Sequence, residues 1–253
     1  MIRSLSKWHG LGVLALGLCS LGGCLHLEPS PTAASSSTVL APESAPKLTP
    51  AQVADVKIAY GRNLEKHGAL DQAQAAYLEA LKLNPGRADA CARLGVLFDQ
   101  QCKFDDASGW HRKAVAAQPK NPDFHCNAGY GQYLRGNMVE AENSLRRCLA
   151  LAPEHARAHN NLGLVLARAG RCEEALGEFR RAGCDEADAQ SNLAHALTLE
   201  GRGSDARACY ERALAVDPNS TTAQKGIREL DQLMAKADAG GRVAKVGATA
   251  GKE

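Results

Sequence analysis

The sequence predicts an all-α solenoid in which helical hairpins stack one on the next. The first observation is a period of 34 residues, with glycine at 61, 95, 129 and 163, alanine at 73, 107, 141 and 175, and proline at 85, 119 and 153. The second is that apolar residues within each copy recur three and four positions apart, which is typical of amphipathic helices. Because a fixed period of 20 to 50 residues indicates one repeated supersecondary unit, these observations favour a repeat protein.

Each copy is predicted to be two helices joined by a short turn. In the first copy, Tyr60 and Leu64 lie on the expected first helix, and Ala73 and Tyr77 lie on the second. The turn position holds Gly68, Gly136, Gly170 and Gly201, with Cys102 in the second copy. Glycine there ends the first helix in a left-handed conformation without Cβ strain, and proline stops the second helix.

These residues resemble the tetratricopeptide repeat (TPR) pattern W-x₂-L-G-x₂-Y…A-x₃-F…P. The second copy, for example, reads Leu94-Gly95-x-x-Phe98, then Ala107-x-x-x-His111, then Pro119. The resemblance implies a right-handed superhelical solenoid of five TPR hairpins within residues 51–220, with copies that start near residues 54, 88, 122, 156 and 187. Residues 221–236 are expected to form a capping helix, and the Gly- and Ala-rich residues 237–253 are expected to be a disordered tail.

The fourth copy departs from the period. Gly163 and Ala194 are 31 residues apart, and the residues 182–186 replace the closing proline. Three residues are therefore expected to be missing from the end of its second helix.

The N-terminus resembles a bacterial export signal. Arg3 and Lys7 precede a short apolar run, and residues 21–24 read Leu-Gly-Gly-Cys. This ending resembles a lipobox, which implies that residues 1–23 are cleaved and that Cys24 carries the lipid; an ordinary signal peptide and an uncleaved anchor are the alternatives. Leu25 stands where aspartate would signal inner-membrane retention, so the resemblance implies the outer membrane, with the protein facing the periplasm. The Pro-, Ser- and Ala-rich residues 24–50 are expected to be a flexible tether.

Composition argues against several classes of function. The chain has 30 basic and 28 acidic residues, and removal of Arg3 and Lys7 with the signal leaves 28 of each. With this balance and 4% aromatic residues, we expect no nucleic-acid binding, because there is neither a basic footprint nor enough rings for base stacking. The sequence has no nucleophile elbow, Walker loop or H-E-x-x-H motif, so we expect neither an enzyme nor a cofactor.

The first helix of each copy carries the candidate binding residues. Asn127, Asn161 and Asn192 share one repeat position, and Asn160 is adjacent. Because an amide both donates and accepts hydrogen bonds, a row of asparagines can hold the backbone of an extended peptide; the alternative is that asparagine here only reflects the repeat consensus. TPR proteins line their concave groove with this helix, which adds Arg93, Tyr130, Tyr133, Leu164, Arg168 and His195 to the predicted groove. The lysine and arginine cluster that would clamp a carboxylate is missing from these positions, so an uncharged or mixed segment is expected.

The cysteines and histidines are the residues that could form thiol or metal sites. Cys148 and Cys172 occupy repeat positions that are small or apolar in other copies and are predicted to be core residues. Any disulfide or reactive thiol is expected to come from Cys91, Cys102, Cys126, Cys184 and Cys209. His155 and His159 are four residues apart, a spacing that can present two imidazoles to zinc. However, His125 shares the repeat position of His159, so a structural role is expected and no metal site is predicted.

The sequence as a whole predicts a non-catalytic scaffold that binds a protein or peptide. A lipobox followed by five repeats resembles the tight-adherence pilus assembly lipoproteins (TadD) and the type IV pilus pilotins. This resemblance implies a secretin or another pilus assembly component as the partner, and a membrane attachment through the lipid. Self-association through terminal helices is left open. The alternatives are an adaptor that recruits cell-wall hydrolases and a thiol- or metal-binding protein.

Overall fold

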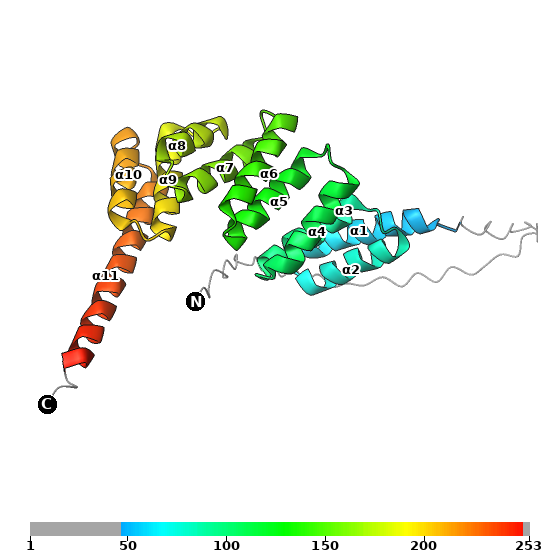
Figure 1. Cartoon of the computed structure of the whole chain (residues 1–253), viewed down its shortest axis with the longest axis horizontal. Coiled ribbons are helices and arrows are strands. Elements are labelled where there is room, and N and C mark those ends of the chain that lie inside the picture. The colour runs from blue at the N-terminus through cyan, green and yellow to red at the C-terminus, as the bar shows by residue number, and fades with distance from the viewer. Residues whose placement is uncertain (1–46, 250–253) are drawn as a thin grey trace, which may run out of the picture. The chain divides into compact units, whose positions relative to one another are not determined.

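The structure, a computed structural model, describes residues 47–249, and its side chains to residue 236 (Figure 1). These residues form helices and contain no strand, so the predicted all-α class is confirmed. The helices are α1 (Pro50–Lys66), α2 (Leu70–Leu83), α3 (Ala88–Gln100), α4 (Phe104–Ala117), α5 (Pro122–Arg135), α6 (Met138–Leu151), α7 (Ala156–Arg168), α8 (Cys172–Arg181), α9 (Glu186–Leu199), α10 (Gly203–Val216) and α11 (Thr221–Thr249).

Consecutive helices pair as antiparallel hairpins, and the hairpins pack on one another. The pairs are α1 with α2, α3 with α4, α5 with α6, α7 with α8, and α9 with α10. The second helix of each pair contacts the first helix of the next pair, and the first helices α3, α5, α7 and α9 also contact one another in order. The first helices therefore form one continuous layer, and α11 packs on α9 and α10 at its end (Figure 1).

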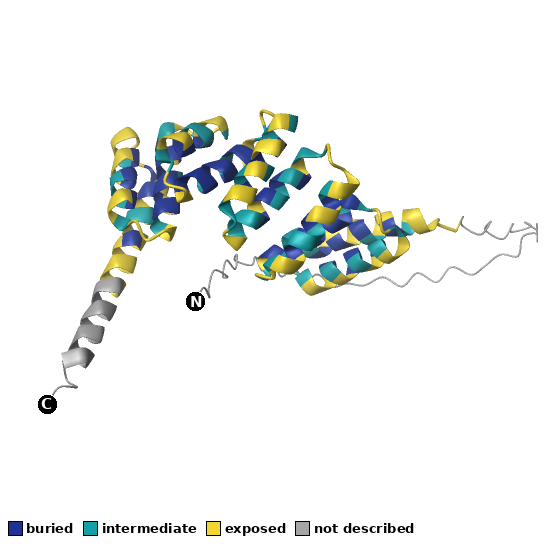
Figure 2. Ribbon diagram, in the orientation of Figure 1, coloured by how far each residue is buried: buried dark blue, intermediate teal, exposed yellow. Residues whose placement is uncertain are grey.

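The core lies between the paired helices, where Figure 2 shows the buried residues facing one another. A large buried cluster runs from Cys126 on α5 to Leu230 on α11. Two smaller clusters fill the first hairpins, one around Tyr77 and Leu94 and the other around Ala92 and Phe124.

Glycine in the first helix makes room for a ring of the second helix. A Cβ built on Gly61, Gly95 or Gly163 would lie 2.7, 2.5 or 2.6 Å from the side chains of Tyr77, His111 or Phe179, respectively. No real Cβ tolerates such distances, so the helices approach closely only because these positions lack a side chain. This contact explains the glycine part of the 34-residue period.

The turns within the hairpins are left-handed, as the sequence predicted. Gly68, Gly136, Gly170 and Gly201 have φ between 73° and 93°, and Cys102 has φ 58°. The cysteine that interrupts the glycine pattern therefore keeps the same backbone conformation, at the steric cost that a Cβ brings.

The fourth hairpin is shortened at the predicted place. Helix α8 has 10 residues, whereas α2, α4, α6 and α10 have 14 each. It ends at Arg181 and is followed by Gly183 with φ 96°.

The C-terminal helix is longer than predicted. Helix α11 begins at Thr221 and continues to Thr249, beyond residue 236 and into the stretch expected to be a disordered tail. That stretch contains several alanines and no proline, and alanine has the highest helix propensity, so helix formation can continue there.

The membrane-related predictions fall mostly outside the described residues. The predicted signal peptide 1–23, the predicted lipid site Cys24 and the predicted tether up to residue 46 lie outside the described residues, as do residues 250–253. Among the helices of residues 47–249, none combines the length and the apolar character that a membrane span requires.

Candidate functional site

A pocket of about 580 Å³ lies over the layer of first helices, lined from α3, α5 and α7. We call it the central pocket. Five of the predicted groove residues line it: Asn127, Tyr130, Asn160, Asn161 and Leu164. Asp99 and Arg157 bring one acidic and one basic group to its wall. The central pocket therefore combines apolar, amide and charged groups of both signs.

Aromatic side chains of α5 shape one side of the groove. The rings of Tyr130 and Tyr133 are stacked, with centroids 6.0 Å apart and an interplanar angle of 23°. Arg168 lies over the Tyr133 ring at 5.7 Å and forms an ion pair with Glu200 at 2.8 Å. Tyr130 is 39% exposed, so it is the ring of this pair that offers apolar area to a partner.

The asparagines of the shared repeat position are partly used by the fold. Asn161 is buried, and its amide nitrogen lies 3.7 Å from the Sγ of Cys126. The amide nitrogen of Asn192 lies 3.4 Å from the Sγ of Cys184. At least two of these three amides therefore direct a donor into the protein, and a continuous row of free amides is not present. The half-buried Asn127 and its neighbour Asn160 are the amides at the central pocket.

The remaining predicted groove residues lie elsewhere. Asn192 and His195 line a second pocket of about 500 Å³, together with Tyr210 and residues of α11. Arg93 donates to Glu65, with Nε 2.9 Å from Oε1, and lines a smaller pocket on α1 and α3. Eight of the ten predicted residues are thus distributed over three cavities, and Tyr133 and Arg168 line none of these, so the predicted residues do not form one uniform row.

A buried polar pair beneath the central pocket was missed by sequence reasoning. Asp99 Oδ2 and His111 Nε2 are 2.7 Å apart, and both side chains are at least nine-tenths buried. The other atoms, Asp99 Oδ1 and His111 Nδ1, are buried and have no hydrogen-bond partner among the described residues. Because buried polar atoms are usually paired, Asp99 Oδ1 and His111 Nδ1 are exceptions among the described residues.

The Asp99–His111 contact belongs to a recurring arrangement, in which a polar residue meets a polar ring 12 residues later. Glu65 Oε1 accepts from the Tyr77 hydroxyl at 2.5 Å, and the fifth copy has Thr198 and Tyr210 at the same two positions. Burial raises the pKa of Tyr77 to about 12, so its hydroxyl remains a donor. The other two copies have apolar partners at the second position, in the pairs Tyr133 with Leu145 and Ala167 with Phe179. Comparing the copies position by position would have revealed this pattern.

His155 and His159 do not act together. His159 contacts Glu178 at 2.6 Å through Nδ1 and the carbonyl oxygen of Pro153 at 2.7 Å through Nε2. Nδ1 of His155 accepts from the backbone N–H of Ala158 at 3.1 Å and thereby caps α7. The structural role predicted for His159 agrees with its contacts.

The cysteines differ in part from the prediction. Cys148 is buried as expected and Cys172 is half-buried, but Cys91, Cys126 and Cys209 are buried as well. Burial raises the pKa of all three of these thiols, which disfavours the reactive thiolate. Their repeat positions hold variable or polar residues in other copies, but here the hairpin contacts enclose these thiols. All seven described cysteines are free, and Cys102 is the exposed one.

Comparisons with known proteins identify the relatives of this chain. Tetratricopeptide repeat models match residues 64–126, 133–192 and 189–222. The type IV pilus assembly protein PilF of Pseudomonas aeruginosa is 33% identical over 113 residues, which cover 44% of this chain and 45% of PilF. The chain spans between 14% and 45% of the length of the curated relatives it matches.

Solved structures show the same architecture. A structure of Pseudomonas aeruginosa PilF is similar with a TM-score of 0.55 and 25% identity, over 73% of this chain and 93% of that one. A TPR protein of Thermus thermophilus is similar with a TM-score of 0.53 and 23% identity, over 70% of this chain and 98% of that one.

Proposed function

The chain belongs to the tetratricopeptide repeat family of protein-interaction scaffolds, and from this premise we propose that it binds an extended segment of a protein partner in the central pocket without catalysing a reaction. The observation that carries this proposal is the combination of groups over α3, α5 and α7. Tyr130 and Leu164 supply apolar contact area, and Asn127 and Asn160 supply amides. A volume of about 580 Å³ lies within the range of about 300 to 1,000 Å³ that is typical of ligand-binding pockets.

The charges of the central pocket indicate the kind of segment it accepts. Asp99 contributes an acidic side chain that is paired with His111. Arg157, on the opposite helix of the lining, contributes a basic side chain that is paired with Asp123. We therefore expect a segment that has an apolar anchor side chain and no excess of positive or negative charge. For a contact of this size we expect a dissociation constant of about 1 μM, which corresponds to about 8 kcal/mol.

Pilus assembly is the process we propose for this scaffold. Its support is the similarity to PilF, which is named for type IV pilus assembly, together with the lipobox-like residues 21–24. In this proposal Cys24 carries a lipid that holds the chain on the periplasmic side of the outer membrane. The partner is then a secretin or another component of the pilus assembly machinery.

The anchoring is tested by replacing the lipid-bearing residue. Cells that produce the wild-type chain or Cys24→Ser are labelled with palmitate and separated into inner-membrane, outer-membrane and soluble fractions. We expect label in the wild-type chain and its presence in the outer-membrane fraction, and loss of both in Cys24→Ser. Label that persists in Cys24→Ser, or its absence from the wild type, would overturn the anchor.

The partner and the pocket are tested together in the source bacterium. Deletion of the gene is expected to abolish detergent-resistant secretin multimers in the outer membrane. The wild-type chain should restore them, whereas Tyr130→Ala with Asn160→Ala should not, although its helical circular dichroism is unchanged. The matched control is Val139→Ala, because Val139 is 71% exposed on α6, outside the central pocket.

Each outcome decides one part of the proposal. Multimers that form normally in the deletion strain contradict the secretin partner. Full restoration by the double variant contradicts binding in the central pocket.

A further inference from the structure

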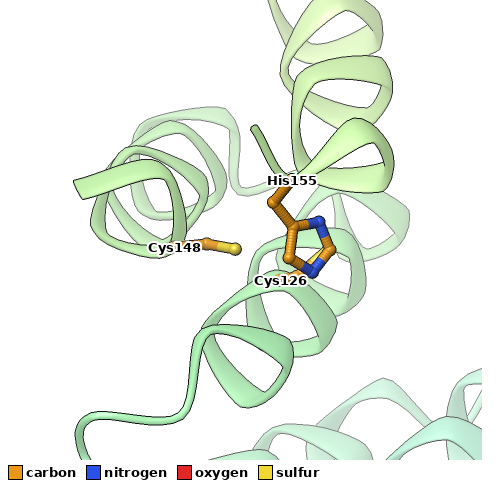
Figure 3. Close-up of side chains that lie close together, drawn as sticks. All are labelled: Cys126, Cys148 and His155. Carbon is orange, nitrogen blue, oxygen red and sulfur yellow. The ribbon is translucent and has the colours of Figure 1, made fainter. Parts of the chain in front are cut away.

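Three side chains that commonly ligate metals converge where α5, α6 and the start of α7 meet (Figure 3). They are Cys126, Cys148 and His155, and one ligand atom from each lies within 4.8 Å of the other two. Both thiols are completely buried, and the imidazole is half-buried. The three side chains do not line the central pocket, but the cluster adjoins it, because Asn161 of the pocket lining lies 3.7 Å from Cys126 Sγ.

We propose that Cys126, Cys148 and His155 bind a zinc ion, with the carboxylate of Asp123 as the fourth ligand. Two thiolates and one imidazole form a donor set that zinc prefers, in tetrahedral geometry. With bonds of about 2.3 Å to sulfur and about 2.0 Å to nitrogen, tetrahedral donors are roughly 3.5 Å apart. Since these three atoms are already within 4.8 Å of one another, side-chain adjustments of about 1 Å bring them to the spacing that zinc requires.

Asp123 lies next to the imidazole of the cluster but outside the group of three mutually close donors, so its carboxylate must turn toward the thiols to become the fourth ligand. Its Oδ1 lies 3.1 Å from Nε2 of His155, and its side chain is 61% exposed. A metal ion can therefore enter from solvent beside this carboxylate. Zinc at Nε2 replaces the hydrogen bond to Asp123, the imidazole proton moves to Nδ1, and the capping bond from Ala158 is given up. The two thiols release their protons to solvent.

The surroundings suit the charge of such a site. Two thiolates, one carboxylate and Zn²⁺ carry a net charge of −1, and Arg157, 2.9 Å from Asp123 Oδ1, brings a positive charge beside the site. The amide nitrogen of Asn161 is 3.7 Å from Cys126 Sγ. Such donors around the ligands orient them and stabilise the thiolate.

Packing alone does not account for these residues. The repeat position of Cys148 holds Ala80, Ala114 and Ala213 in other copies, each fully or almost fully buried, so the core needs only a methyl group there. The position of His155 holds Asn121 in the preceding copy, where asparagine caps α5. Each of these two ligands therefore replaces a residue that suffices for the fold, and the replacements meet at one point.

Zinc binding is measured on the purified full chain under reducing conditions. We expect about one zinc per chain after dialysis. The melting midpoint should rise by about 5 to 10 °C when free zinc is 100 times the dissociation constant. Cobalt in place of zinc should give a thiolate-to-cobalt charge-transfer band and the visible spectrum of a tetrahedral site.

Variants taken from the other copies preserve the fold while they remove ligands. Cys148→Ala and His155→Asn should weaken zinc binding about 100-fold or more with little change in the melting midpoint of the metal-free chain. Cys102→Ser is the matched control, because Cys102 is exposed and outside the cluster, and it should bind zinc as the wild type does.

The proposal is overturned if the variants retain wild-type zinc affinity, or if Cys102→Ser loses as much zinc as they do. It is also overturned if mass spectrometry finds Cys126 and Cys148 joined in a disulfide while the reduced chain takes up no zinc.

Discussion

At the scale of single residues, the hairpins are distinguished by which side chains meet across them. Glu65 with Tyr77 and Asp99 with His111 are polar versions of a contact that is apolar in the third and fourth copies. The Asp99–His111 pair is the most deeply buried of these, and Gly131 must lack a Cβ because that atom would lie 2.9 Å from Asp99. Three helices are therefore adapted to one polar pair.

The first prediction concerns this pair. His111→Phe should lower the free energy of unfolding by about 3 kcal/mol, because it leaves the Asp99 carboxylate buried without its partner. The double change Asp99→Ala with His111→Phe reproduces Ala167 and Phe179 of the fourth copy and should recover most of that loss. Urea denaturation measures both. A double variant as unstable as His111→Phe would show that the loss comes from packing of the ring and not from the unpaired charge.

Residue-scale features were predictable where they depend on the local chain. The left-handed turns follow from glycine at one repeat position, and they were predicted correctly. Cys102 departs from this pattern in residue type but has the same backbone conformation. The cluster of Cys126, Cys148 and His155 was not predicted, because residues 22 and 29 positions apart meet only when the rotation of three helices is known. The direction of the Asn161 and Asn192 amides toward sulfur depends on the same rotations.

At the scale of the structural element, each hairpin is set by a close helix contact and a left-handed turn. The glycine of the first helix allows the two helices of the hairpin to approach closely. The left-handed turn residue reverses the direction of the chain between them. In the second hairpin Cys102 adopts the left-handed conformation of the turn, although glycine is the residue best suited to it. Its left-handed φ of 58° costs a residue with a Cβ about 1 to 2 kcal/mol.

The second prediction follows for this turn. Cys102→Gly should raise the free energy of unfolding by about 0.5 to 1 kcal/mol, since relief of the strain exceeds the added entropy of the unfolded chain. Cys102→Ala keeps the Cβ and should give no gain. Gly68→Ala should lose about 1 kcal/mol for the same reason, because no atom lies within 4 Å of the added Cβ and only the backbone conformation opposes it. Thermal unfolding of the three variants measures whether their stabilities change in the expected directions. Equal effects of Cys102→Gly and Cys102→Ala would show that the change comes from loss of the thiol and not from the backbone conformation.

At the scale of the whole array, stability is distributed along the chain of hairpins. In a solenoid each unit contacts only its neighbours, so stability is close to a sum of units and interfaces. The buried residues of this array fall into one large cluster from α5 to α11 and smaller ones from α1 to α5. Period and helix content were predictable from sequence, but this division was not, because it depends on how well each pair of hairpins is packed.

The third prediction is that the two parts open separately. Leu94 and Leu193 share a repeat position and are 0% and 2% exposed, one in the N-terminal part and one in the large cluster. Leucine-to-alanine changes in such sites cost about 2 to 5 kcal/mol. In hydrogen exchange, Leu94→Ala should lower protection in α1 to α4 and leave α7 to α10 unchanged, because opening at one end need not disrupt distant interfaces. Leu193→Ala should do the converse. If either variant lowers protection evenly from α1 to α10, the array unfolds as one cooperative unit, and the boundary near α5 has no energetic meaning.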